Sequence, residues 1–320
     1  MLARLRNLAE AMTAAESAPC ALHEINPFTA PSYASMTARG HRALLVAPAA
    51  NEMPVAVGAS VRDLPVGLAL ARVEAPRRAE LVSVYVVPDH RGRGIGRRLV
   101  EALEQSLATR DVGELAAVYA LTDAGGAPIE RFLARCGWPI GTGRMRFFAL
   151  DGAIMEDPWF KSAVLPDTYG ISPWTTVTEA ERGLLADRQA SAWIPEALMP
   201  FRFEADLEPR TSLVLRHHWD LIGWVLTRRL NASTLHYSNL FVRPSRNRVG
   251  RTFAALALLA DAVRRMTGWL GVRSQGHFEV THDNAAMLRF IERHMAARLL
   301  DRRDLARVTK RVAAASGQGV

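Results

Sequence analysis

The chain has 320 residues, 49% of them hydrophobic and 22% charged, which is typical of a globular protein with room for two ordinary domains. No apolar run approaches the roughly eighteen residues of a membrane span. The N-terminal segment also lacks the uninterrupted apolar stretch of a cleavable signal, so we expect a cytoplasmic protein with no membrane partner. The two cysteines, Cys20 and Cys136, form neither a metal-type nor a redox-type pair, and the nine histidines lack zinc-ligand spacing. We therefore expect no metal.

The first half of the chain contains both strand-like and helix-like apolar patterns. A β-rich pair of segments is separated by Arg62-Asp63, which predicts a hairpin. From Gly94 onward, apolar side chains recur at helical spacing opposite charged ones. In chain order the pattern predicts strands over 54–60, 65–73 and 80–87, a helix from Gly94, a strand over 114–122, a helix over 127–138 and a terminal strand over 144–150.

The second half repeats the first at an offset of 156 residues. The segment 66–70 (VGLAL) falls on 222–226 (IGWVL), Pro88 falls on Pro244, and Gly94 falls on Gly250. We therefore predict two copies of one mixed α/β domain, residues 1–155 and 156–320, each with a mainly antiparallel central sheet flanked by helices. The elements expected in the second copy are strands over 211–218, 221–230 and 235–242, a helix over 250–266, a strand over 269–281 and a helix over 284–300.

The stretch 86–96, VVPDHRGRGIG, joins a strand to an amphipathic helix. Glycines allow phosphate oxygens to approach the backbone, and a helix N-terminus offers unpaired N–H groups and the positive end of its dipole. The stretch is neither a Walker loop nor a dinucleotide fingerprint, because no GK[ST] follows it and the spacing is R-x-x-G-x-G. The pattern predicts a pyrophosphate site formed by Val86, Val87, Arg91, Gly92, Arg93, Gly94, Ile95, Gly96 and Arg97.

With these residues the chain resembles the GNAT superfamily of acyl-CoA-dependent N-acyltransferases. The pattern V-x-P-x-x-[QR]-x-x-G-x-[GA] is met by Val86, Pro88, Arg91, Gly94 and Gly96. The order of the expected strands and helices in both copies agrees with that family as well. The resemblance implies acetyl-CoA or another acyl-CoA as the donor, bound by the N-terminal copy.

The second copy departs from the pattern at its phosphate loop. Asn247 stands where Arg91 does, and Thr252 stands where Gly96 does. The β-branched Thr252 should hinder close backbone approach of a pyrophosphate. We therefore expect a degenerate loop there, and a C-terminal copy that serves the acceptor or a partner.

The candidates for proton transfer are Glu80, His236, Tyr85 and Tyr119. The resemblance places the general-base glutamate of the histone-acetylating branch at Glu80, and the 156-residue offset places His236 at the same position of the second copy. A solvated strand-end carboxylate is the simpler reading of Glu80. The tyrosine acid that many members carry is absent, because Leu133 and Ile291 occupy its position. The two strand tyrosines are possible substitutes for that acid, although strand tyrosines are more often packing residues.

A second polar group lies near the end of the chain's second copy. It contains His277, Glu279, His282 and Asp283, which could bind an acceptor or lie on an ordinary surface. The whole net charge of +8 also belongs to this half, with 23 basic and 15 acidic residues after residue 160 and 17 of each before it. The excess suits coenzyme A phosphates, an acidic carrier protein or a nucleic acid, and a solvated Arg-rich surface explains it equally well.

These observations lead to an expected function, with two alternatives. We expect an acyltransferase that moves an acetyl or other acyl group from acyl-CoA to the amine of a small molecule by direct attack in a ternary complex. The alternatives are a donor thioester carried by an acidic acyl carrier protein and a non-catalytic acyl-CoA-binding protein. We do not expect a nucleic-acid partner, and a homodimer is left open.

Overall fold

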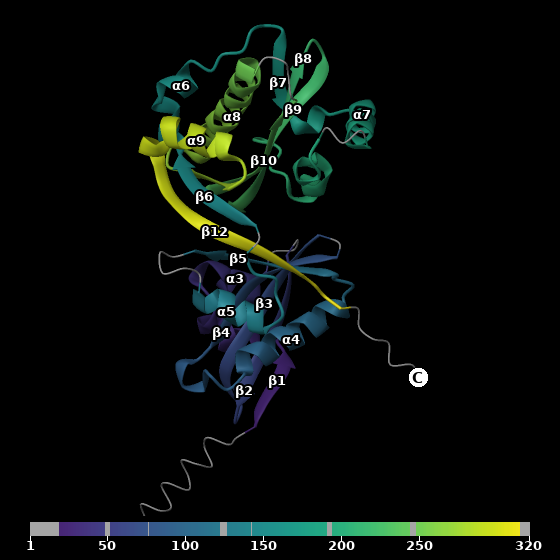
Figure 1. The fold of residues 1–320 in the computed structure, drawn as a ribbon, viewed down its shortest axis with the longest axis vertical. Coiled ribbons are helices and arrows are strands. Elements are labelled where there is room, and N and C mark those ends of the chain that lie inside the picture. The colour runs from purple at the N-terminus through teal and green to yellow at the C-terminus, as the bar shows by residue number, and fades with distance from the viewer. Residues whose placement is uncertain are drawn as a thin grey trace, which may run out of the picture. The chain divides into compact units, whose positions relative to one another are not determined.

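The computed structural model describes residues 19–48, 52–75, 77–121, 127–141, 143–190, 194–243 and 248–313. The chain forms two compact units of mixed α and β structure (Figure 1). Unit 1 comprises Met1–Arg144 with Leu305–Val320, and unit 2 comprises Met145–Asp304. None of the helices in the described ranges is long and apolar enough to cross a membrane.

Unit 1 contains a sheet with the strand order β1-β2-β3-β4-β5-β12, to which β12 contributes its second half. All neighbours are antiparallel except β4 and β5, which are parallel. Its elements are β1 (Cys20–Glu24), α2 (Ala30–Tyr33), η1 (Ala34–Met36), η2 (Arg39–His41), α3 (Arg42–Val46), β2 (Met53–Val61), β3 (Leu64–Ala75), β4 (Arg78–Val86), η3 (Pro88–His90), α4 (Ile95–Ala108), β5 (Glu114–Ala120), α5 (Ala127–Arg135) and β12 (Leu299–Arg311).

The two faces of this sheet are covered by different helices. On one face the apolar stripe of α4 packs against β2, β3 and β4, and its residues Leu99, Leu103 and Leu107 are fully buried. On the other face the short helices α2 and α3 cover Leu68 and Leu70 of β3. Because both faces are buried there, β3 is continuously apolar from Val66 to Ala71, as its sequence indicates.

Unit 2 has the strand order β6-β11-β10-β9-β8-β7. Here β10 and β11 are parallel, and the other neighbouring strands are antiparallel. Its elements are β6 (Arg144–Asp151), η4 (Gly152–Glu156), α6 (Pro158–Lys161), β7 (Tyr169–Pro173), η5 (Trp174–Thr176), α7 (Glu179–Ala190), η6 (Glu196–Leu198), η7 (Pro200–Asp206), β8 (Leu213–His217), β9 (Asp220–Asn231), β10 (Thr234–Val242), α8 (Arg248–Leu270), β11 (Gln275–Thr281), α9 (Ala285–His294) and η8 (Ala296–Arg298).

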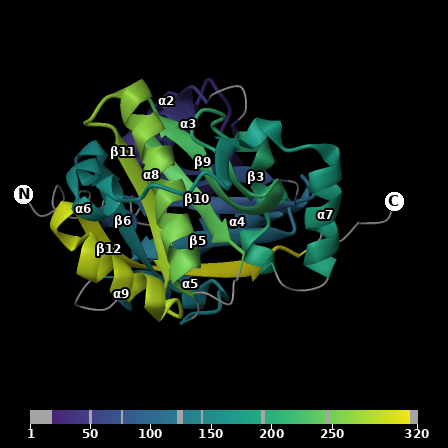
Figure 2. The same ribbon diagram turned by 90° about the horizontal axis from the view of Figure 1, so that it is seen from above.

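Helix α8 lies across β8, β9 and β10 and forms the centre of the larger core of unit 2 (Figure 2). The opposite face of the sheet packs against α7, with Trp174 and Trp224 in contact and both buried. Helix α9 begins where the sequence predicts, because the Asn284 side chain accepts a hydrogen bond from the Met287 N–H at 3.3 Å.

The predicted repeat is confirmed by backbone features at the same 156-residue offset. Arg62 and Asp63 both have positive φ in the β2–β3 turn, and His218 and Trp219 have it in the β8–β9 turn, which is the geometry of a two-residue hairpin turn. Gly67 faces Val86 as Gly223 faces Val242. A Cβ at either glycine would lie 3.1 Å or less from a carbonyl oxygen of the opposite strand, so both copies need glycine there.

Two strands pair differently from what the expected division of the chain at residue 155 implies. Strand β6, expected to complete the first copy, pairs with β11 of unit 2 along its whole length. The edge of β5 is instead paired with Leu305–Arg311 of β12. This last strand was not predicted, because the expected helix over 284–300 ends at His294 and β12 begins at Leu299. The expected strand over 269–281 is also shorter, because α8 continues to Leu270.

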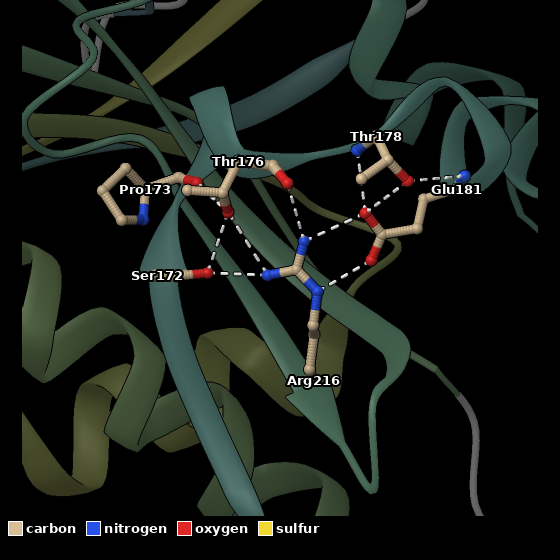
Figure 3. Close-up of polar contacts among 6 residues, drawn as sticks. All are labelled: Ser172, Pro173, Thr176, Thr178, Glu181 and Arg216. Carbon is tan, nitrogen blue, oxygen red and sulfur yellow. Dashed lines mark hydrogen bonds and ion pairs between the residues drawn. The ribbon is translucent and has the colours of Figure 1, made fainter.

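Arg216 on β8 joins three segments of unit 2, an arrangement that we call the Arg216 clamp (Figure 3). Its Nε and Nη2 donate to the two carboxylate oxygens of Glu181 at 2.7 and 3.0 Å. Nη1 donates to Ser172 Oγ at 2.6 Å, and Nη2 also donates to the Thr176 carbonyl at 3.2 Å. Glu181 in turn accepts from the Thr178 N–H at 2.8 Å and so caps α7. The clamp therefore fixes β7, α7 and β8 together.

We predict that Arg216→Ala lowers the stability of unit 2 by about 2 kcal/mol, because it leaves a half-buried carboxylate without its partner. Urea unfolding followed by tryptophan fluorescence measures this loss. The control, Arg264→Ala, removes an exposed ion pair to Asp261 and should change stability little. The Arg216 hydrogen bonds hold the pKa of Glu181 below its usual value. The stabilisation is therefore present at neutral pH and lost as pH falls through that lowered pKa, so the two unfolding curves should converge in acid.

Candidate functional site

The stretch predicted to bind pyrophosphate forms an open turn between β4 and α4 in unit 1. Gly92 and Gly94 have φ of 77° and 75°, and a Cβ on either would meet nothing within 4 Å. The first helical hydrogen bond of α4 joins the Arg98 N–H to the Gly94 carbonyl at 3.1 Å. The preceding amides therefore form the free N-terminus of the helix. Gly96 is close-packed instead, because its Cβ would lie 3.1 Å from the Phe132 ring. We call residues 91–97 the cradle.

The arginines of the cradle differ in the contacts that their side chains make within the protein. Arg91 donates through Nε to the Val86 carbonyl at 2.9 Å, and its guanidinium carbon lies 5.6 Å from the centroid of the Tyr85 ring. Arg97 is paired with Glu101 one helical turn away at 2.6 Å. Arg93 is exposed. The Val87 N–H is used within the sheet, donating to the Val66 carbonyl at 2.9 Å.

Strands β4 and β5 separate before either of them ends. Their parallel pairing covers only Arg78–Leu81 against Glu114–Ala117, although β4 continues to Val86 and β5 to Ala120. A β-bulge interrupts the other edge of β4, where Leu70 pairs with Ser83 but Ala71 pairs with Leu81, so that Val82 is skipped. The separation, which we call the splay, opens the edge of β4 next to the cradle.

The candidate base Glu80 lies at the start of the splay and is held by Arg72 of the neighbouring strand, with Nη2 to Oε2 at 2.8 Å. Burial raises the pKa of Glu80, but the charge of Arg72 together with side-chain hydrogen bonds to Glu74 and Arg72 outweighs it, so the pKa lies below its ordinary value. His41 faces the same pair. Burial and the charge of Arg72 lower the pKa of His41, and its Nδ1 is buried without a hydrogen-bond partner. No pattern in the sequence indicates His41 or Arg72 as residues of this site.

The two candidate tyrosines lie on β4 and β5, as predicted. Tyr119 donates to Glu130 Oε1 of α5 at 3.2 Å, and burial together with this hydrogen bond raises the pKa of Tyr119 to about 12. The phenol therefore stays protonated at neutral pH. Tyr85 packs against the core under α2 and α3 and carries the Arg91 guanidinium on its ring.

The corresponding loop of unit 2 has a different backbone. Asn247 lies outside the described residues. Helix α8 starts at Arg248, so Gly250 is already helical, whereas its counterpart Gly94 precedes α4. The Val242 carbonyl, equivalent to that of Val86, accepts from Arg251 Nε of the helix at 2.8 Å. The left-handed glycine turn of unit 1 therefore has no counterpart at Gly250.

The polar group predicted in unit 2 divides into two parts. Glu279 is brought to His236, with Oε2 to Nε2 at 2.7 Å, and His277 lies beside them. These three groups surround a second splay, in which β10 and β11 pair only over Thr234–His236 against Gln275–His277. His282 instead contacts Asp304 at 3.3 Å. Asp283 accepts a hydrogen bond from the Thr281 hydroxyl.

We predict that Arg72→Met raises the pKa of Glu80, because burial then acts with less opposition, and raises that of His41, which loses a neighbouring positive charge. NMR titration of the Glu80 carboxyl and the His41 imidazole measures both. Arg78→Met is the control, since it removes an exposed pair to Glu114 from the same strand and should move neither pKa. Unchanged titrations in Arg72→Met would refute the electrostatic coupling.

Comparison with known proteins agrees with this architecture. Residues 16–138 match the family described as Acetyltransferase (GNAT) family. A tandem GNAT protein from the clavulanic acid biosynthesis pathway is 15% identical with a TM-score of 0.58, and the match covers 93% of this chain and all of that one. A GCN5-related N-acetyltransferase from Sphaerobacter thermophilus is 16% identical with a TM-score of 0.59, covering 92% and 97% of the two chains.

A third match is a glucosamine N-acetyltransferase region of a fungal multi-domain β-N-acetylglucosaminidase, 12% identical with a TM-score of 0.62, covering 91% of this chain and 38% of that one. No curated protein sequence matches the chain significantly. At these identities the structural likeness establishes the fold. The predicted resemblance is thereby confirmed: residues 16–138 match the GNAT family, and the fold of the chain is that of a tandem GNAT protein.

Proposed function

We propose that this protein is a cytoplasmic N-acyltransferase that moves an acyl group, such as acetyl, from acyl-CoA to the amine of a small molecule. The observation that carries the proposal is the cradle of unit 1. Two left-handed glycines with open space above them lead into a free helix N-terminus. This is a site at which phosphate oxygens can contact the backbone.

Arg91 and Arg93 supply positive charge to the same site. The guanidinium of Arg91 is fixed through its Nε, which leaves its Nη groups to reach an anion, and Arg93 is exposed on the loop. Pyrophosphate would bind by charge-assisted hydrogen bonds to these groups and to the α4 amides. The pairing of Arg97 with Glu101 makes Arg97 the weaker contributor.

The splay supports binding of the rest of the donor. Beyond Leu81 the edge of β4 is not paired with β5, so an extended ligand with amide groups can hydrogen-bond there. Because Arg91 already occupies the Val86 carbonyl, we expect the ligand to use other backbone groups of this edge. The thioester would then lie near the bulge at Val82, between Glu80 and the two tyrosines.

Glu80 is the candidate base of unit 1. Its lowered pKa keeps it ionised at neutral pH, so it can accept a proton from an amine directly or through a water. The same lowered pKa makes it a weak base, which suits a role that orients the amine as much as it deprotonates it. Tyr119, with its raised pKa, remains a donor and could protonate the leaving thiolate.

We predict that Gly94→Asp weakens acetyl-CoA binding by at least about 100-fold, because a carboxylate would stand next to the pyrophosphate. Isothermal titration with acetyl-CoA measures the affinity. Gly141→Asp is the matched control: Gly141 also has positive φ and open space around it, so the backbone strain is similar, but it lies outside the cradle. Equal affinities in the two variants would exclude the cradle as the donor site.

We further predict that Glu80→Gln lowers the rate of thiol release from acetyl-CoA by about 10²-fold while the affinity for acetyl-CoA is unchanged. A panel of primary amines serves as acceptors, including polyamines, amino sugars and amino acids. Transfer from an acylated carrier protein but never from acetyl-CoA would contradict the proposed donor. Binding without turnover on any amine would instead favour a non-catalytic protein.

A further inference from the structure

Unit 2 contains a chain of hydrogen bonds at its own splay that unit 1 lacks. Ser238 Oγ lies 2.9 Å from Nδ1 of His236, and Nε2 of His236 lies 2.7 Å from Glu279 Oε2. His236 and Ser238 follow one another on β10, and Glu279 comes from β11. A hydroxyl, an imidazole and a carboxylate joined in this order form the arrangement that activates a serine as a nucleophile.

The charge state of Glu279 determines where the imidazole proton lies. Burial raises the pKa of Glu279, but its hydrogen bond to His236 and the nearby positive charges outweigh burial, so this pKa is lowered and the carboxyl is ionised at neutral pH. An ionised carboxylate can only accept, so Nε2 of a neutral His236 must carry the hydrogen. Nδ1 then has the free lone pair, and the Ser238 hydroxyl donates to it. The serine is therefore hydrogen-bonded to a base in the required direction.

Ser238 also occupies a special backbone position. In the pairing of β10 with β9, Tyr237 faces Thr227 and Asn239 faces Leu226, so Ser238 is the skipped residue of a β-bulge. Bulges change the direction of a side chain and are frequent next to active sites. The equivalent bulge residue of unit 1 is Val82. Both His236 and Ser238 remain partly accessible, on the side where β10 has separated from β11.

The three positions carry different chemistry in the two units. From the matching strand registers, His236, Ser238 and Glu279 replace Glu80, Val82 and Val118. A repeated fold requires no hydrogen-bonded chain at these positions, because unit 1 forms the same bulge and splay without one. The polar set is therefore an addition to the fold of unit 2.

A buried amide next to the serine has no role in the fold. Asn239 is 3% exposed, and neither its Nδ2 nor its Oδ1 has a hydrogen-bond partner in the described structure. An unpaired buried amide costs free energy, and functional sites are one place where such a cost is retained.

We propose that Ser238 is an acyl-accepting nucleophile of unit 2, with His236 as its base and Glu279 as the residue that orients His236. Ser238 Oγ attacks the carbonyl carbon of an acyl ester or thioester and passes its proton to His236 Nδ1. The C–O bond to serine forms, the bond to the leaving group breaks, and His236 returns the proton to the departing oxygen or sulfur. An amine or a water then attacks the acyl-serine ester, His236 takes its proton, and that proton restores the Ser238 hydroxyl.

This second activity does not rest on donor binding by the cradle of unit 1. An activated ester can reach Ser238 without a pyrophosphate site, so the two proposals fail independently. Gly94→Asp should lose acetyl-CoA affinity and keep ester-dependent acylation of Ser238. Ser238→Ala should keep acetyl-CoA affinity and lose that acylation.

The test uses the full chain and p-nitrophenyl acetate. We expect a burst of one p-nitrophenolate per chain, a mass increase of one acetyl group and an adduct that peptide mapping places on Ser238. Ser238→Ala should abolish the burst. His236→Asn and Glu279→Gln should each slow it by about 10²-fold. Ser233→Ala is the matched control, since the hydroxyl of this exposed serine of the same hairpin donates to its neighbour Asn231 and its loss should change nothing.

A further variant separates loss of the nucleophile from loss of the fold. Ser238→Cys keeps a nucleophile at the position and should give an acetyl thioester, which neutral hydroxylamine removes. Far-ultraviolet circular dichroism checks that each variant is folded. The proposal is overturned if the wild-type chain shows no burst, if the adduct maps to another residue, or if folded Ser238→Ala retains the burst. In those cases the Ser238–His236–Glu279 chain is only a surface hydrogen-bond network.

Discussion

The chemistry of both units depends on the short parallel pairing at the centre of each sheet. Strands β4 and β5 share four paired residues, and β10 and β11 share three, before each pair separates while its strands continue. Backbone groups on the freed edges must be satisfied by water or by a ligand. The separation therefore creates, in one step, a place for an extended ligand and a gap in which side chains such as Glu80 or His236 can act on it.

The features that keep the strand arrangement the same in both units are short and local in the sequence. Two-residue turns with positive φ set the register of the β2–β3 and β8–β9 hairpins. Glycines at 67 and 223 allow the next strand to approach, because a Cβ would collide with the carbonyl of Tyr85 or Phe241. The bulges at Val82 and Ser238 follow from that register. The side chains in the gap are under none of these constraints, so the two copies could diverge in chemistry while keeping one backbone.

Much of the fold was accessible from the sequence, because periodicity, hairpin turns and the repeat are all local signals. The cradle was accessible for the same reason, as its glycines stand together in the chain. The exchange of β6 and β12 was not, since the charged sequence of β12 gives no clear strand pattern and the sequence does not specify which sheet edge each strand joins. The pairing of Glu80 with Arg72 was not accessible from the sequence either. The same holds for the hydrogen bonds of Ser238 with His236 and of His236 with Glu279. These contacts depend on strand register and on a bulge, which a single sequence does not specify.

The two gaps also differ in what their charges can do. In unit 1 the carboxylate of Glu80 is tied to a guanidinium that cannot give up its proton, so any proton taken from an amine there must go to the carboxylate itself. In unit 2 the carboxylate of Glu279 is tied instead to the imidazole of His236, whose other ring nitrogen lies within hydrogen-bond distance of the Ser238 hydroxyl. The equivalent strand positions of Glu80 and His236 are therefore the basis of two different proposals, direct attack on a bound thioester in one copy and a covalent acyl-serine in the other. A chain with both could hold a donor in one unit and carry an acyl group on the other.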